Sequence, residues 1–338
     1  MQAVISAIEY DLPEGQLTNE MLGAEYPEWS VEKIEEKIGI SVRRITAKDE
    51  CASDMGVRAA EKLFASGVCN REDIDYLLFC TQSPDYFLPT TACLMQDRLG
   101  LPKSCGALDF NLGCSGYIYG LGLAKGLIET GQARNVLLIT AETYSKHIHT
   151  GDKSVRTLFG DAAAATLIQS SGKAELKIGP FVYGTDGSGG KNLIVPTSGF
   201  RTPRTEESAR VDEDEQGNLR SQDNLYMNGS EIFTFTLRTI PKSVKELLSL
   251  SGKSLDDIDL FVFHQANKFM LEHLRKKLSV PEEKFYMSFK NYGNTVSSTI
   301  PIALKDAQRE GKLKSGDLVM LVGFGVGYSW GATLLHWV

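Results

Sequence analysis

The sequence predicts an α/β fold that contains two copies of one structural unit. Apolar runs rich in Val, Ile and Leu alternate with segments whose apolar residues recur at the helical period, as in layered α/β proteins. The repeat is visible in the letters, because EDIDYLLFC at Glu72–Cys80 aligns with DDIDLFVFH at Asp256–His264. Each copy then continues through a glycine into a helix, at Gly113–Cys114 in the first and Gly293–Asn294 in the second. These two pairs should therefore occupy equivalent places.

The individual elements follow from the same two patterns. Buried strands are expected where an apolar run is bounded by turn-forming or charged residues, namely at Ile74–Cys80, Asn135–Thr140, Leu260–His264 and Leu318–Val322. Helices are expected where apolar residues recur every three or four positions, namely at Asp54–Ala65, Ser115–Thr130, Ile240–Leu250, Phe269–Leu278 and Ser298–Glu310. The two halves should span residues 1–175 and 231–338, joined by a connecting excursion at 176–230 whose acidic run Glu206–Glu215 is typical of a solvated surface.

Composition excludes several classes of protein. With 42% hydrophobic and 23% charged residues in a chain of 338, the sequence is typical of a folded globule and not of a disordered, collagenous or coiled-coil protein. The net charge is −7, from 36 Lys and Arg against 43 Asp and Glu. No global positive field exists to hold nucleic acid or anionic lipid, so an anionic ligand would need a local basic patch.

The cysteines and the N-terminus predict a cytoplasmic location. All six cysteines fall between residues 51 and 114, without a Cys-x-x-Cys pair or a histidine at metal-binding spacing. This distribution argues against a disulfide framework or a zinc site. The first residues also lack the basic segment and the long apolar run of a signal peptide. We therefore expect a cytoplasmic protein with reduced thiols.

The apolar C-terminal segment predicts a pair of strands. Leu318–Val338 carries no charged residue and is long enough to span a bilayer, but Gly323, Gly325, Gly327 and Gly331 interrupt it. Two buried strands joined by a glycine turn fit this pattern better. The glycines do not predict a nucleotide-binding loop, because they lack the Gly-x-Gly-x-x-Gly spacing and lead into a strand.

Cys114 is a candidate nucleophile. It follows Gly113 at the start of an expected helix, and a helix N-terminus lowers the pKa of a thiol. The alternative interpretation is a small core residue, which is the more common role of a free cysteine.

His264 and Asn294 complete a chemically consistent trio with Cys114. His264 ends an expected buried strand, and Asn294 occupies the place equivalent to Cys114 in the second copy. Taken alone, the histidine could be structural and the asparagine could belong to a turn. Together, a thiolate and two hydrogen-bond donors to an oxyanion suit acyl transfer and carbanion formation beside a thioester.

The sequence resembles the β-ketoacyl-acyl-carrier-protein synthase III group of the thiolase superfamily over essentially its whole length. Five motifs in the family's order carry this resemblance: Leu112–Gly116 (LGCSG), Phe159–Ala163 (FGDAA), His264–Asn267 (HQAN), Tyr292–Thr295 (YGNT) and Gly323–Gly331 (GFGVGYSWG). The resemblance implies a thiolase-like fold of two βαβαβαββ-type halves in a layered αβαβα arrangement. It also implies a homodimer that works without a metal or other cofactor.

The resemblance further implies a decarboxylative Claisen condensation. Cys114 would take an acyl group from acyl-CoA or an acyl carrier, and the enolate formed from malonyl-acyl-carrier-protein would attack it. His264 and Asn294 would hold the malonyl thioester oxygen, while the backbone N–H groups of Cys114 and Val326 would form an oxyanion hole.

Several positions are assigned to substrates only by this resemblance. The expected substrate-binding residues are Leu88, Phe324, Asn267, Lys153 and Arg156. Lys153 stands where the family commonly has an arginine stacked near the CoA adenine, which weakens the case for free CoA as donor. Leu88 stands where a phenylalanine is common in straight-chain enzymes, on a loop that resembles the one closing the partner's acyl pocket. The resulting hypothesis is that the acyl pocket admits a longer or branched acyl group.

A basic patch is the expected contact for the carrier protein. It would comprise Lys268, Arg275, Lys276 and Lys277, together with Arg43 and Arg44. Phe269 departs from the family, which often has an arginine there. A solvated helix face is the alternative interpretation.

Three rival functions remain open from the sequence. The acyl group could pass to an alcohol or amine in a specialised pathway, water could resolve the acyl-enzyme as in Cys-His-Asn hydrolases, or the chain could be a silent subunit. Asn294 favours carbon–carbon bond formation, since an enolate needs that donor more than simple acyl transfer does. No papain-type Cys-Gly-Ser-Cys-Trp segment is present, and the complete trio argues against a silent subunit.

Overall fold

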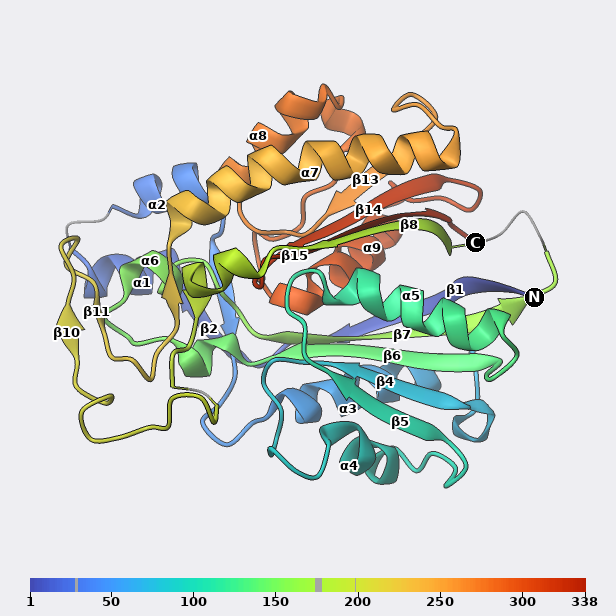
Figure 1. The fold of residues 1–338 in the computed structure, drawn as a ribbon, viewed down its shortest axis with the longest axis horizontal. Coiled ribbons are helices and arrows are strands. Elements are labelled where there is room, and N and C mark those ends of the chain that lie inside the picture. Colours follow the sequence, from blue (N-terminus) through green and yellow to red (C-terminus); the bar gives the residue numbers. More distant parts are fainter. Residues whose placement is uncertain (28–29, 174–177, 198) are drawn as a thin grey trace.

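A computed structural model describes residues 1–27, 30–173, 178–197 and 199–338, and two stacked sheets form its centre (Figure 1). The first sheet has the order β1 (Gln2–Asp11), β7 (Ala162–Ser171), β6 (Asn135–Glu142), β4 (Tyr76–Cys80) and β5 (Gly106–Phe110). The second has the order β8 (Ile178–Thr185), β15 (Ser329–His336), β14 (Leu318–Gly325) and β13 (Leu260–Phe263). The four strands expected from apolar runs are all present.

The two sheets share one pairing pattern, which confirms the internal repeat. β4 runs parallel to β6, and β7 and β1 follow antiparallel. In the second sheet β13 runs parallel to β14, and β15 and β8 follow antiparallel. The edge strand β5, parallel to β4, has its counterpart in a single parallel bridge between Phe261 and Phe285.

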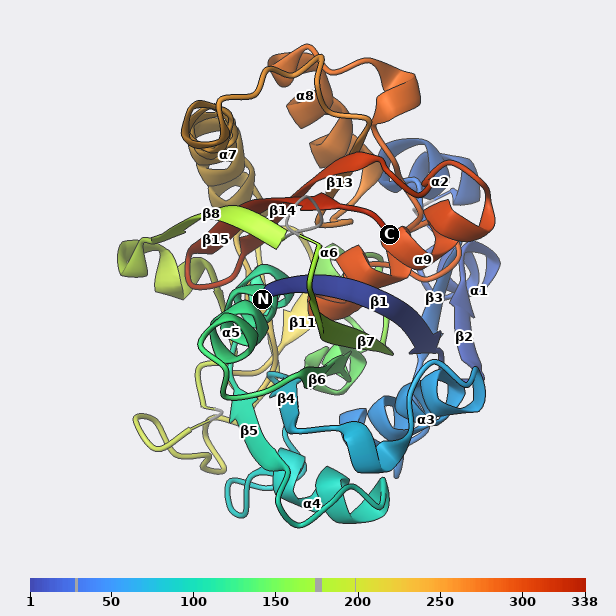
Figure 2. The ribbon, with the colours of Figure 1, turned by 90° about the vertical axis from the view of Figure 1, so that its right-hand side faces the viewer.

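Helices separate and cover the two sheets, which gives the expected αβαβα layering. Figures 1 and 2 show α5 (Gly116–Glu129) and α9 (Thr299–Arg309) between the sheets. The helices α3 (Ala52–Ala65) and α4 (Thr91–Arg98) cover the outer face of the first sheet. The outer face of the second is covered by α7 (Gly229–Ser251) and α8 (Lys268–Leu278). Most of the buried apolar residues of both helices belong to one cluster that includes residues of both sheets, whereas Gln308 and Arg309 at the end of α9 are exposed.

The middle helix α5 approaches its neighbours closely because of small residues. A Cβ at Gly120 would lie 2.7 Å from Leu138 of β6, and a Cβ at Gly331 of β15 would lie 2.9 Å from Ile118. Both distances are shorter than a carbon–carbon contact allows. Glycine therefore sets the spacing that brings the start of α5 against the second sheet.

The smaller elements gather at one end of the molecule (Figure 1). They are the helices α1 (Asn19–Glu25), α2 (Val31–Ile38) and α6 (Lys153–Arg156), and the strands β2 (Gly15–Thr18), β3 (Val42–Ile45), β9 (Leu193–Ile194), β10 (Asp212–Glu213), β11 (Leu219–Arg220) and β12 (Tyr226–Met227). No helix in the described part of the chain combines the length and apolarity needed to cross a membrane.

The expected connection at 176–230 needs a correction. Its early part, Ile178–Thr185, forms the strand β8 and pairs with β15, so it belongs to the second sheet. The sequence hides this strand because it contains Gly179 and Pro180, which a strand tolerates only at a sheet edge. The expected boundary between residues 175 and 176 lies outside the described residues.

Candidate active site

Cys114 lies where the two halves of the chain meet. It precedes α5, whose N-cap is Ser115, and only 5% of the residue is exposed. A Cβ at Gly325 of β14 would lie 2.8 Å from both Cβ and Sγ of Cys114. The thiol from the first half is therefore seated directly on a glycine of the second half.

Burial dominates the ionisation of this thiol. Loss of solvation raises the pKa of Cys114 to about 12, although the backbone groups of Val326 and Cys114 favour the thiolate. The expected lowering of the pKa by the helix N-terminus is therefore outweighed, and the thiol is protonated at neutral pH. Val326 and Cys114, whose backbone groups favour the thiolate, are also the two residues expected to form an oxyanion hole.

His264 follows β13 and carries a neutral ring. The residue is 2% exposed, and burial lowers its pKa to about 3. Nδ1 lies 2.8 Å from Oγ1 of Thr299, and the ring of Phe324 contacts the imidazole edge-to-face with centroids 5.6 Å apart. Nε2 has no hydrogen-bond partner among the described residues.

Asn294 has a fixed amide orientation. Its backbone N–H donates to Leu158 O at 2.8 Å, and its O accepts from Gly160 N–H at 3.0 Å. The side-chain Oδ1 accepts from the N–H of Val296 at 3.0 Å. Nδ2 consequently points the other way, and it has no hydrogen-bond partner within the described part of the chain.

Three short segments bring these side chains to one place. A Cβ at Gly113 would lie 2.7 Å from Cγ1 of Val326 and 3.3 Å from Cγ1 of Val296. The turn that carries Cys114, the candidate nucleophile, therefore packs against the glycine turn after β14 and against the turn that carries Asn294. Phe324 precedes Gly325 on β14, and its ring contacts the imidazole of His264. The histidine therefore belongs to this cluster as well.

A cavity of about 1370 Å³ opens beside the start of α8. Lys153, Asn267 and Phe269 line it, along with residues 214–216, 218, 220 and 226–230. Asn267 caps α8, because its Oδ1 accepts from Met270 N–H at 2.9 Å. Two of the expected substrate-binding residues, Lys153 and Asn267, therefore share one cavity.

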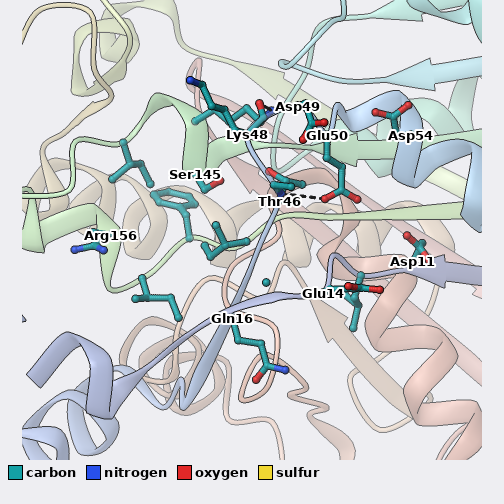
Figure 3. Close-up of a pocket in the computed structure, with 18 of the residues that line it drawn as sticks. Asp11, Glu14, Gln16, Thr46, Lys48, Asp49, Glu50, Asp54, Ser145 and Arg156 are labelled. Atoms are coloured by element: carbon teal, nitrogen blue, oxygen red, sulfur yellow. Dashed lines mark hydrogen bonds between the residues drawn. The ribbon is translucent and has the colours of Figure 1, made fainter. Parts of the chain in front are cut away.

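Arg156 lies in a different groove, of about 1540 Å³. Figure 3 shows it at the left of this groove, with Asp11 at the right. Its guanidinium is bound by Glu25 and donates to Thr150 O at 2.9 Å. The structure thus does not bring Arg156 to the cavity that Lys153 lines.

Leu88 lies on an exposed apolar loop. It is 82% exposed, and its neighbours Tyr86 and Phe87 are 62% and 76% exposed. The ring of Phe87 contacts that of Phe200, which is 90% exposed. Leu88 lines neither of the two large cavities of its own chain.

The expected basic patch is only partly on the surface. Lys268, Lys276 and Lys277 of α8 are exposed, whereas Arg275 donates from Nη2 to Glu272 at 2.8 Å. Arg43 must be removed from the patch, because it is fully buried and donates to Thr157 O at 2.7 Å.

Sequence reasoning missed two polar residues beside the trio, Thr299 and Glu142. Thr299 bonds to His264 as described above. Glu142 is the last residue of β6 and is fully buried. A lone acidic residue directly after an apolar strand was the only available signal for it.

A buried thiol, a buried neutral imidazole and a carboxamide N–H without a partner among the described residues, in a duplicated α/β fold, are the groups that a cysteine-dependent acyltransferase uses. Comparison with known proteins gives the family. Residues 108–187 match the family model described as 3-oxoacyl-[acyl-carrier-protein] synthase III, and residues 248–337 match that of its C-terminal part. The chain belongs to the 3-oxoacyl-[acyl-carrier-protein] synthase III family, also called β-ketoacyl-[acyl-carrier-protein] synthase III.

Individual relatives agree over nearly the full length. The β-ketoacyl-[acyl-carrier-protein] synthase III of Clostridium perfringens is 38% identical over 96% of this chain and 95% of its own. A crystal structure of a 3-oxoacyl-(acyl-carrier-protein) synthase III superimposes with a TM-score of 0.98 at 53% identity, over 100% of both chains. The 3-oxoacyl-(acyl-carrier protein) synthase of Burkholderia xenovorans gives 0.92 at 39% identity, over 100% of this chain and 94% of its own.

Proposed function

We propose that this chain loads an acyl group on Cys114 and condenses it with malonyl-acyl-carrier-protein to give a 3-oxoacyl product. The observation that carries the proposal is the Nδ2–H of Asn294, which has no hydrogen-bond partner in the described part of the chain, together with the neutral ring of His264. A developing enolate oxygen requires neutral hydrogen-bond donors of this kind.

In the first half-reaction, the Cys114 sulfur attacks the thioester carbonyl of the donor. As the carbon–sulfur bond forms, the thiol proton is transferred to the sulfur of the donor, and the carbonyl oxygen becomes an oxyanion. The backbone N–H groups of Cys114 and Val326 stabilise that oxyanion. Its collapse expels the thiol of the donor, CoA or carrier, and leaves the acyl group on Cys114.

In the second half-reaction, the malonyl carboxylate leaves as CO₂, and its bonding electrons form an enolate. Nδ2–H of Asn294 and Nε2–H of His264 hold the enolate oxygen. Nε2 carries the proton only when the hydroxyl of Thr299 donates to Nδ1 of His264 instead of to Val296 O, which lies 3.0 Å from it. The enolate carbon then attacks the acyl carbonyl, and Cys114 leaves as thiolate.

Substrates and carrier would reach the site through the cavity beside α8. Lys153 and Asn267 line its wall, and Phe324 packs on His264 at the reacting centre. The exposed Lys268, Lys276 and Lys277 offer positive charge to an acidic carrier protein.

A homodimer completes this proposal. The strand β5 has only one hydrogen-bonded neighbour, β4, among the described strands, and Leu108 at its centre is 42% exposed. An unpaired edge strand with an apolar residue is suited to pairing with a second copy. The exposed Leu88 would then enter the partner's acyl pocket.

The rate of CO₂ release coupled to acyl consumption tests the proposal. Replacing Asn294 with Ala should lower the condensation rate by about 10²–10³-fold, the usual cost of one lost oxyanion donor. Loading of Cys114 should stay near the wild-type rate, because Asn294 acts only on the enolate. Acyl consumption without CO₂ release by the wild-type enzyme would point to an alcohol, an amine or water as acceptor instead.

A further inference from the structure

Glu142 joins the two halves of the site by hydrogen bonds. Its Oε2 accepts from the Gln82 N–H at 3.0 Å and from Ser83 Oγ at 3.2 Å, both in the first half. Its Oε1 accepts from Ser297 Oγ at 3.0 Å, in the second half. No step of the proposed reaction uses this buried carboxyl group.

Ser297 belongs to the turn that orients Asn294. Within this turn Val296 has a φ of 56°, in the left-handed region that β-branched residues rarely adopt. The N–H of Val296 is also the group that fixes the amide of Asn294. A strained turn of this kind persists only when its surroundings hold it, and Glu142 supplies a bond to the next residue.

The same carboxyl group lies close to the nucleophile turn. Gln82, whose backbone donates to Glu142, has its Oε1 2.5 Å from the place of a Cβ on Gly113. Oε1 of Gln82 also accepts from the hydroxyl of Tyr144 at 2.5 Å. Glu142 thus bonds to Gln82, which lies against the Cys114 turn, but it does not bond to that turn. It bonds directly to Ser297 of the turn that carries Asn294.

We propose that Glu142 is a positioning residue for the condensation half-reaction, where it holds the turn that aims Asn294 Nδ2–H at the enolate oxygen. This inference rests on the proposed function, because it requires Asn294 to act there. It predicts that loss of Glu142 affects condensation far more than acyl loading.

Glutamine is the matched conservative replacement. Burial raises the pKa of Glu142 to about 8, so the carboxyl group is largely neutral at pH 7. A glutamine can accept from Gln82 and Ser83 through its oxygen and donate to Ser297 through its amide, since a hydroxyl both donates and accepts. Alanine removes all three bonds.

The test compares the two half-reactions in Glu142→Ala, Glu142→Gln and Ser298→Ala. Ser298 is the control, because it is the residue next to Ser297 but does not bond to Glu142. Its hydroxyl donates to Thr140 O at 3.0 Å instead. Loading is measured by intact mass after incubation with acyl donor, and condensation by CO₂ release from pre-acylated enzyme. Thermal unfolding reports whether each variant is folded.

Glu142→Ala should lower condensation by about 10²-fold, the effect of misplacing a catalytic group by about 1 Å, while loading changes by less than about threefold. Glu142→Gln should restore most of the condensation rate, and Ser298→Ala should leave the ratio of the two rates unchanged. Should Glu142→Ala fail to fold, Ser297→Ala supplies the same comparison, since it removes the hydrogen bond between Ser297 and Glu142 and keeps the carboxyl group.

Equal losses in both half-reactions, unimpaired condensation, or a glutamine variant as defective as the alanine variant would each overturn the inference. These outcomes are distinct from failure of the proposed function. In that case the wild-type enzyme would release no CO₂, or Asn294→Ala would condense at the wild-type rate.

Discussion

At the scale of single residues, two side chains of the trio, Asn294 and His264, have their orientation fixed by a hydrogen bond to a neighbour. The N–H of Val296 orients the amide of Asn294, and Thr299 holds one ring nitrogen of His264. The atoms left over, Nδ2 and Nε2, are therefore aimed before any substrate arrives. Preorganised donors of this kind need no rearrangement during the reaction.

Burial of His264 predicts how condensation depends on pH. Its pKa is lowered to about 3, so the ring stays neutral far below its ordinary value of 6.5. The rate of CO₂ release from pre-acylated enzyme should therefore show no loss between about pH 7 and 5.5. Stopped-flow or single-turnover assays would measure it, and pre-acylation removes the ionisation of Cys114 from the profile. A decline with a midpoint near 6.5 would show that the ring titrates and would contradict this assignment.

The sequence predicts the trio, but it does not predict the residues that hydrogen-bond to it or to the turn that carries Asn294. Cys114 and Asn294 occupy equivalent places in the repeat, and His264 ends the repeated strand, so their positions follow from the duplication. Thr299 and Glu142 bond to residues that are distant along the chain. Such contacts leave no periodic pattern. The thiol pKa was misjudged for a related reason, because burial depends on the packing of both halves.

At the scale of elements, strand β14 brings the second sheet against the nucleophile through its glycines. A Cβ at Gly323 would lie 2.9 Å from the backbone O of Cys114, and one at Gly325 would lie 2.8 Å from Sγ. These approaches are too short for any side chain. The sequence predicts a turn from these glycines, and in the structure Gly323 and Gly325 also leave the space that Cys114 occupies.

Replacing Gly325 with Ala should displace the nucleophile. Because the new Cβ would meet Sγ, we expect acyl loading to slow by about 10²-fold. The matched control is Gly126→Ala in α5, where no atom lies within 4 Å of the new Cβ and where alanine should stabilise the helix by about 0.5–1 kcal/mol. Loading rates by intact mass and unfolding by circular dichroism would separate the two effects. Unchanged loading in Gly325→Ala would contradict the seating of Cys114.

The edge strand β5 allows a test of the proposed dimer. Introducing a charge by Leu108→Arg should weaken dimerisation at least tenfold, or by about 1.4 kcal/mol, because the proposed interface buries this side chain. Leu250→Arg is the control, since Leu250 is 60% exposed near the end of α7. Sedimentation equilibrium would measure both. A Leu108→Arg protein that associates as strongly as the wild type would exclude β5 as the interface.

The elements that could be predicted were those with a strong local pattern. Continuous apolar runs predicted β4, β6, β13 and β14, because these strands are buried on both faces. The edge strand β8 was assigned to the connection, since Gly179 and Pro180 obscure it. Only its pairing with β15 reveals it as part of the sheet.

At the scale of the whole molecule, duplication creates one site from two halves. In the proposed site the first half contributes Cys114, which precedes the central helix α5, and the second half contributes His264 and Asn294. Neither half contains the full trio, so the proposed chemistry requires the two halves to pack in this arrangement. The shared pairing order of the sheets makes that arrangement approximately symmetric.

The most direct test of the account is intact-protein mass spectrometry with a panel of acyl-CoA and acyl-carrier donors, followed by malonyl-acyl-carrier-protein. We expect a mass gain on Cys114 that disappears with release of a 3-oxoacyl product, and no gain in Cys114→Ala. An adduct that persists in Cys114→Ala would contradict the assignment of the nucleophile. An adduct that survives the malonyl carrier but clears with an alcohol, an amine or water would contradict carbon–carbon bond formation.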